Sequence, residues 1–82
     1  MMGKTTVTEI QSWLVSYIAA QLKVAPDKIP VDEQFVNLGL SSRQAITLTG
    51  DLEEFLDRPT DPALAWEYPT IRQLAQYLAQ AE

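Results

Sequence analysis

The sequence contains neither cysteine nor histidine. Without cysteine, the chain forms no disulfide and no cysteine-containing metal site. Without histidine, it lacks the usual general base near neutral pH and the commonest metal ligand. The sequence also has no glycine-rich loop of the kind that cradles phosphate, and no pair of carboxylates beside a pocket motif. These absences predict a protein that is not an enzyme and that holds no metal.

Long hydrophobic runs and positive charge are also scarce. The longest apolar runs are too short to span a bilayer, and the N-terminal segment, with its single lysine, does not match a secretory signal. Six Lys and Arg residues against eleven Asp and Glu residues give a formal net charge of −5. This balance disfavours nucleic acids and anionic membranes as partners. We therefore expect a cytoplasmic monomer whose partners carry basic patches.

The 82 residues predict a single domain, residues 1–82, with a modest core. Apolar residues at helical spacing predict helices over 7–23, 42–56 and 71–81, with a short helical turn over 63–67. The spacing of a capping box, which is Ser or Thr followed three residues later by Glu or Gln, precedes each long helix. Its pairs are Thr6 with Glu9, Ser41 with Gln44, and Thr70 with Gln73.

Residues 24–40 are predicted to form a long ordered loop, because Pro26 and Pro30 disfavour a helix there. Its apolar residues are expected to pack onto the core, and a loop of this length is often functional. They are Val24, Ile29, Val31, Phe35 and Leu38. The helices are expected to bury the stripes Val7, Ile10, Leu14, Tyr17, Ile18 and Leu22; Ala45, Leu48, Thr49, Leu52, Phe55 and Leu56; and Ile71, Leu74, Tyr77 and Leu78. Three full helices, one short helix and no strand signal predict an all-α bundle of four helices.

Gly50 and Trp66 each leave two interpretations open, and Trp13 has one expected position. Gly50 interrupts the second helix, either for close helix packing or at an unused surface position. Trp66 either lines an opening to the core or packs inside it. Trp13 lies off the main apolar stripe of the first helix and is expected to be half-exposed.

Two adjacent serines stand at the predicted start of the second helix, in the stretch FVNLGLSSRQA, residues 35–45. With Ser41 as the N-cap, Gln44 completes the capping box and the hydroxyl of Ser42 is free. Gly39 allows the chain to bend just before the pair. A phosphodiester on Ser42 would lie at a helix N-terminus, where backbone N–H groups favour negative charge. Alternatively, both serines are ordinary capping residues.

Three segments, FVNLGLSS, LTGDLEEFL and YPTIRQLAQYLA, together resemble an acyl carrier protein. The resemblance covers about residues 7–79 and is closest to carriers of polyketide synthases and fatty-acyl-loading modules. Phe35, Leu38, Gly39 and Ser42 match the family pattern in register. The resemblance implies a four-helix acyl-carrier bundle in which a separate phosphopantetheinyl transferase attaches 4′-phosphopantetheine to Ser42. The thiol of that arm would hold an acyl group as a thioester.

The sequence departs from the family pattern on both sides of Ser42. Ser41 replaces the usual Asp, so it keeps the capping role but loses a carboxylate near the transferase's metal and basic residues. Arg43 replaces the usual Leu or Met and puts a positive charge at the unfavourable end of the helix dipole. Arg43 either pairs with the phosphate of the arm, selects a partner with an acidic or polar groove, or is a solvated surface residue.

Residues 51–67 hold six acidic residues and one base. In the resembling family, the outward face of the second helix docks onto basic patches of partner enzymes. The resemblance therefore predicts Arg43, Ile46, Glu53 and Glu54 as partner-binding residues. Alternatively, this face is an ordinary solvated helix exterior. Docking through exposed charges would be fast, weak and sensitive to salt.

The segment Gly39-Leu40-Ser41-Ser42 fits peptidyl carriers less well than acyl carriers, so we expect acyl or polyketide cargo. The resemblance implies loading by a fatty-acyl-AMP ligase or an acyltransferase, followed by transfer to a ketosynthase or another acyl-modifying enzyme. The short termini favour a free-standing carrier. The alternatives are a peptidyl carrier and a non-modified acidic helical adaptor that only docks proteins.

Overall fold

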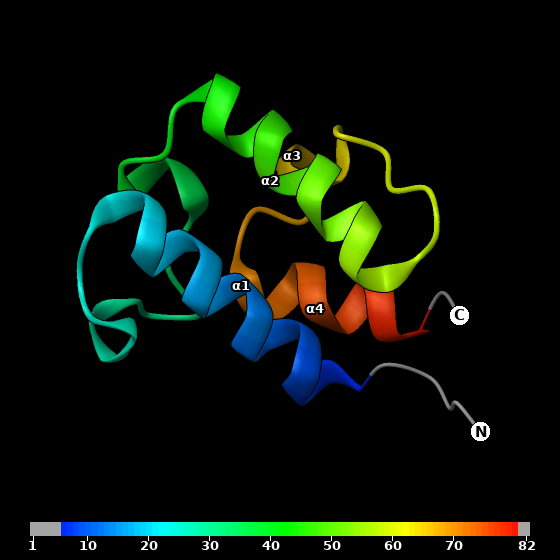
Figure 1. Cartoon of the computed structure of the whole chain (residues 1–82), viewed down its shortest axis with the longest axis horizontal. Coiled ribbons are helices and arrows are strands. Elements are labelled where there is room, and N and C mark those ends of the chain that lie inside the picture. Colours follow the sequence, from blue (N-terminus) through cyan, green and yellow to red (C-terminus); the bar gives the residue numbers. More distant parts are fainter. Residues whose placement is uncertain (1–5, 81–82) are drawn as a thin grey trace.

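The computed structural model describes residues 6–80 and contains four α-helices and two short 3₁₀ helices. The order is α1 (Val7–Leu22), η1 (Pro26–Lys28), η2 (Phe35–Leu38), α2 (Ser42–Leu56), α3 (Leu64–Glu67) and α4 (Ile71–Gln80). Helices α1 and α4 pack closely against each other, and α2 lies above this pair with the short α3 behind it (Figure 1). The all-α bundle predicted from the sequence is confirmed. Ala81, the expected end of the last helix, lies outside the described residues.

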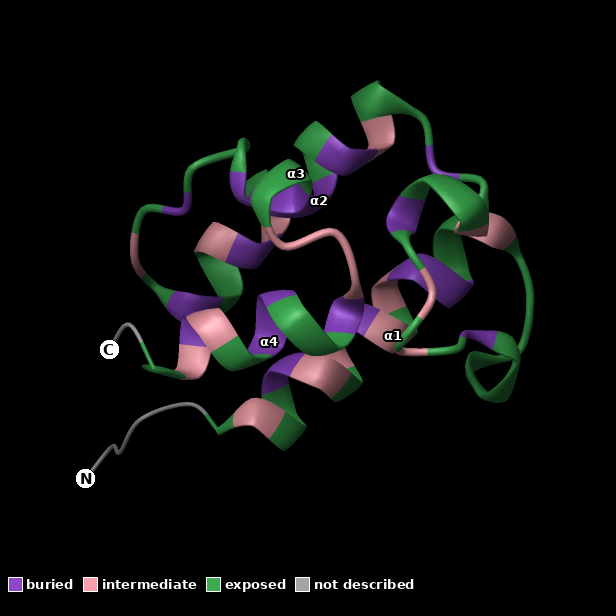
Figure 2. Cartoon of the chain, turned by 180° about the vertical axis from the view of Figure 1, so that it is seen from behind, coloured by how far each residue is buried: buried purple, intermediate pink, exposed green. Residues whose placement is uncertain are grey.

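The core is made by one face of each helix, with exposed residues on the outside (Figure 2). All the long apolar side chains that are completely or almost completely covered belong to predicted stripes. Part of the predicted set, including Val7, Tyr17 and Leu22, is only partly buried at the margin of the core. The buried hydrophobic residues are Ile10, Leu14, Ile18, Ala19, Ile29, Phe35, Leu40, Ala45, Leu48, Leu52, Leu56, Leu64, Ala65, Ile71, Leu74, Ala75 and Leu78.

The segment between α1 and α2 is held against the start of α4 by its backbone. The N–H of Phe35 donates to the carbonyl of Pro69 at 2.8 Å, and the N–H of Arg72 donates to the carbonyl of Val31 at 3.0 Å. Arg72 also forms an ion pair with Asp32, which lowers the pKa of that carboxyl below its ordinary value. These contacts explain why a loop of this length is ordered.

Two details of that loop differ from the prediction. It contains the 3₁₀ turns η1 and η2, and Pro26 begins η1 because its backbone angle suits the first residue of a helical turn. Ile29 and Phe35 are buried as expected, whereas Val24 is 43% exposed. Val24 follows directly on the left-handed residue Lys23, which ends α1 and turns the chain away from the core.

Phe55 was predicted to face the core, but it is 40% exposed. The neighbouring positions Leu52 and Leu56 take the inward side of α2, and Phe55 lies at the edge of their stripe. Its ring stacks on Trp13, with 5.3 Å between ring centroids, and Trp13 in turn stacks on Tyr17. The predicted partial exposure of Trp13 is confirmed, and the three rings together join α1 to α2 at the surface.

Tyr17 and Asp51 add a hydrogen bond between the same two helices, with the hydroxyl donating to Oδ2 at 2.6 Å. Burial and the nearby Asp51 carboxylate raise the pKa of Tyr17 from 10.0 to about 12. Because this folded-state pKa exceeds the unfolded one, the stabilisation is complete below pH 10 and is lost as the pH rises toward about 12.

We therefore expect ultraviolet titration of the native protein to show a tyrosine ionising near pH 12. Asp51→Asn should lower the pKa of Tyr17, because the substitution removes the carboxylate charge. Tyr17→Phe should remove this step. A native titration with no tyrosine ionising near pH 12 would contradict this assignment.

Gly50 occupies an open position on α2, because a Cβ built on it meets no other atom within 4 Å. The close-packing interpretation is therefore wrong, and the surface interpretation is confirmed. We expect Gly50→Ala to stabilise the domain by about 1 kcal/mol, the difference in helix propensity. The measurement is the free energy of unfolding in urea.

Gly39→Ala provides the opposite control, since Gly39 has a φ of 95°, which side-chain-bearing residues rarely adopt. That variant should be destabilised by roughly 1–2 kcal/mol. A loss of stability in Gly50→Ala would show that α2 needs the glycine.

Candidate functional site

The two serines begin α2, and the structure gives them different roles. Ser41 is the N-cap, and its Oγ accepts from the N–H of Gln44 at 3.1 Å. The Gln44 side-chain oxygen accepts from the N–H of Ser41 at 2.9 Å, which completes the predicted capping box. Ser42 is the first residue of α2 and is exposed. Among residues 6–80, no group forms a hydrogen bond with the Ser42 hydroxyl.

The chain on either side of the serines is anchored, so the exposed hydroxyl has a defined position. Gly39, in the left-handed conformation, turns the chain out of η2, and Leu40 then enters the core with 9% exposure. Ala45 and Leu48 continue this anchor on the inner side of α2. Leu40, Ala45 and Leu48 join Phe35 and Ala65 around a small apolar space that does not admit a water molecule.

These observations test whether the site fits a phosphodiester-linked arm. The hydroxyl that would carry the arm is exposed and is not needed by the capping box, which Ser41 and Gln44 complete between them. The first N–H groups of an α-helix have no partner within the helix and favour negative charge. The site therefore fits 4′-phosphopantetheine on Ser42 both sterically and electrostatically.

Outward from Ser42, α2 presents a mixed surface. Arg43, Ile46, Glu53 and Glu54 fall within an arc of about 100° on the outward side of α2, at about 100° per residue, with partly buried Glu53 at its edge. Ile46 is 55% exposed and is the apolar member of this otherwise charged set. The structure thus places all four predicted partner-binding residues on one outward face, which we call the α2 face.

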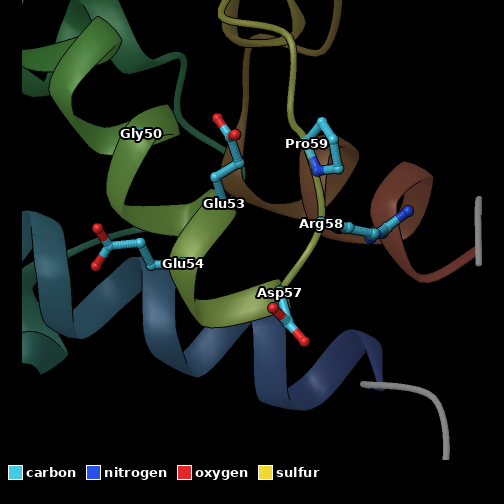
Figure 3. A pocket seen from close by; sticks show the side chains of 6 residues that line it. All are labelled: Gly50, Glu53, Glu54, Asp57, Arg58 and Pro59. Atoms are coloured by element: carbon cyan, nitrogen blue, oxygen red, sulfur yellow. The ribbon is translucent and has the colours of Figure 1, made fainter.

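Acidic side chains gather at the C-terminal end of this face, around the shallow hollow drawn in Figure 3. Glu53 and Glu54 project from α2 in different directions, and Asp57 follows one turn later. Arg58 points instead toward α4, where its guanidinium donates to the carbonyl of Leu78. The single base of this segment is therefore turned inward, and the outward charge around the hollow is negative.

Trp66 and Val36 were not predicted as surface features, yet they are 53% and 56% exposed. The interpretation that Trp66 packs inside the core is wrong, and the interpretation that it lines an opening to the core stays a prediction. The four-residue helix α3 has room for only one buried side, which Leu64 and Ala65 fill. The nearby prolines, Pro62 and Pro69, were the available signal that this helix is too short to bury a third large residue.

The site and the bundle together fit a small helical carrier domain whose second long helix begins with an exposed serine. The family model described as "Phosphopantetheine attachment site" matches residues 12–78. The chain belongs to this family of phosphopantetheine-carrying proteins, whose members hold intermediates rather than catalyse reactions. The resemblance to acyl carrier proteins is thereby confirmed, and 4′-phosphopantetheine is the cofactor of the family.

Individual relatives agree with this membership. The chain is 40% identical over 74 residues to a phenolphthiocerol/phthiocerol polyketide synthase of Mycobacterium tuberculosis. That match covers 90% of this chain but only 4% of the synthase polypeptide.

Within the residues that the structure describes, no helix is long and apolar enough to cross a membrane.

Two solved structures share the fold. One is Asl1650, an acyl carrier protein from Anabaena sp. PCC 7120 with a variant phosphopantetheinylation-site sequence. It is 42% identical, with a TM-score of 0.88, over 98% of this chain and 91% of its own. The other is a free-standing peptidyl carrier protein of Acinetobacter baumannii, 32% identical, with a TM-score of 0.87, over 94% of this chain and 96% of its own.

Proposed function

We propose that this chain carries an acyl or polyketide intermediate on a 4′-phosphopantetheine arm attached to Ser42. The observation that carries the proposal is the exposed Ser42 hydroxyl, which is free of the capping box formed by Ser41 and Gln44. Attachment would join the Ser42 oxygen to the β-phosphorus of coenzyme A and release adenosine 3′,5′-bisphosphate, while the hydroxyl proton passes to a base of the transferase. The arm supplies a terminal thiol, which this cysteine-free chain lacks.

Acyl or polyketide cargo is supported by the polyketide synthase relative and by the Gly39-Leu40-Ser41-Ser42 segment. We propose a fatty-acyl-AMP ligase or an acyltransferase as the loading enzyme, and a ketosynthase or another acyl-modifying enzyme as the recipient. The proposed site of action is the cytoplasm, where coenzyme A is available to the transferase. The peptidyl carrier remains a second candidate, since a peptidyl carrier protein has the same fold with a TM-score of 0.87.

Loading of the arm-bearing protein distinguishes the two cargo classes. The protein is offered ATP with a fatty acid and a fatty-acyl-AMP ligase, and separately ATP with an amino acid and an amino-acid-adenylating enzyme. We expect the mass of a fatty-acyl thioester in the first reaction and no aminoacyl thioester in the second. The reverse pattern would assign the chain to the peptidyl carriers.

We further propose that the α2 face docks onto basic patches of these enzymes. Glu53 and Glu54 would meet the positive charges, and exposed Ile46 would contribute apolar contact near the arm. Arg43 lies on the same face, next to the attachment position, where a partner must approach. Exposed charges of this kind mainly speed the encounter and are screened by salt.

The double variant Glu53→Gln/Glu54→Gln should raise the transferase's KM for this carrier by about 2- to 10-fold at low salt, because each exposed ion pair contributes up to about 1 kcal/mol. The difference should shrink at high salt. Asp27→Asn/Glu33→Gln is the matched control, since it removes two charges from the loop rather than from α2. Equal effects of the two double variants would show that only net charge matters.

A further inference from the structure

Arg43 is the only cation on α2 and lies at its second position, directly after Ser42. Its side chain is exposed, and no hydrogen bond or ion pair holds the guanidinium within the part of the chain that the structure describes. The first turn of α2 contains no acidic residue. A positive charge there is opposed by the helix dipole, whose N-terminal end is itself positive.

The acidic residues of α2 are too far along the helix to explain this arginine. The first of them is Asp51, eight residues later, or about 12 Å along the helix axis. The polar side chains beside Arg43 are also engaged, because those of Ser41 and Gln44 bond to each other's backbone. The donors that the first turn presents to a bound anion are therefore the guanidinium of Arg43 and the unpaired N–H groups of the helix start.

We infer that Arg43 binds the phosphodiester of the arm on Ser42, and this inference rests on the attachment proposed above. The phosphodiester introduces one negative charge on the adjacent residue, and a guanidinium matches phosphate oxygens with paired N–H donors. Arg43 is thus a positioning residue that restrains the base of the arm. Its charge opposes the helix dipole before attachment and is paired with the phosphate after it.

Removing the charge of Arg43 should therefore have opposite effects on the stability of the unmodified protein and of the arm-bearing protein. Arg43→Gln keeps nearly the same helix propensity and removes only the charge and the fork of donors. We expect this variant to raise the urea midpoint of the unmodified protein and to lower that of the arm-bearing protein. Lys28→Gln, an exposed cation of η1, removes the same charge far along the chain from Ser42 and should shift both forms equally.

The test compares the two urea midpoints for the wild type, Arg43→Gln, Arg43→Lys and Lys28→Gln, with intact mass showing the state of each sample. The ³¹P resonance of the arm gives a second readout. It should move in Arg43→Gln, move less in Arg43→Lys and stay unchanged in Lys28→Gln. Equal shifts of both midpoints in Arg43→Gln, with an unmoved ³¹P resonance, would overturn the inference and leave the attachment intact. A wild type that gains no arm would instead overturn the attachment and this inference with it.

Discussion

Ser42→Ala is expected to abolish attachment of the arm without unfolding the domain, whereas Ser41→Ala keeps attachment and loses stability. The Ser42 hydroxyl is exposed and takes no part in the capping box, so its removal costs the fold little. The Ser41 hydroxyl accepts the N–H of Gln44, and loss of such a cap costs about 1 kcal/mol, within a range of about 0.5–2.

The two variants are compared by intact mass after incubation with coenzyme A and a transferase, and by urea unfolding of the unmodified proteins. The absence of cysteine adds a direct readout, because, once coenzyme A has been removed, any thiol on this chain that reacts with a thiol reagent must belong to the arm. Ser12→Ala, an exposed serine of α1, should leave attachment unchanged and cost no stability, because Ala is the better helix former. Attachment that survives in Ser42→Ala and disappears in Ser41→Ala would exchange the roles of the two serines.

Leu48→Ala is expected to cost about 2–5 kcal/mol of the free energy of unfolding, while Ile46→Ala two residues earlier costs at most about 0.5 kcal/mol. Leu48 is 1% exposed and lines the small apolar space beneath the start of α2, so its truncation leaves a cavity. Ile46 is 55% exposed on the α2 face. Since small domains have only about 5–15 kcal/mol of stability, Leu48→Ala removes a large fraction of it.

Urea unfolding of both variants checks this contrast, and association with the transferase gives the complementary result. Ile46→Ala should weaken docking while the fold stays intact, because its side chain contributes to the α2 face and not to the core. Similar losses of stability in the two variants would contradict the assignment of inner and outer faces on α2.

Local sequence chemistry predicted the helices and their beginnings. The boxes at Thr6 and Ser41 are complete as predicted, because each depends only on residues three apart. The third is only half formed. Thr70 Oγ1 accepts the N–H of Gln73, but the Gln73 side chain accepts from the Thr70 hydroxyl instead of its backbone. Thr70 also forms an isolated antiparallel bridge with Gln34, a long-range contact that local spacing does not reveal.

The features that the sequence did not predict have separate causes. Phe55 has the spacing of a core residue, yet it lies at the edge of the stripe that Leu52 and Leu56 fill, where its ring stacks on Trp13. Trp66 is exposed because the length of α3 limits what it buries. At the site, the roles of Ser41 as N-cap and Ser42 as first helical residue were predictable, because capping depends on residues close in the sequence. The arm on Ser42 was inferred from the resemblance to acyl carrier proteins. Folding placed Arg43 and the acidic residues on one outward face.

The measurement that tests the central claim most directly is the intact mass of the wild-type protein after incubation with coenzyme A and a broad-specificity phosphopantetheinyl transferase. A known carrier is modified in the same tube as a control. We expect a gain of one phosphopantetheinyl group, together with one reactive thiol where the chain has none. No gain in a folded protein, with the control carrier modified, would contradict attachment at Ser42 and favour a non-modified helical adaptor.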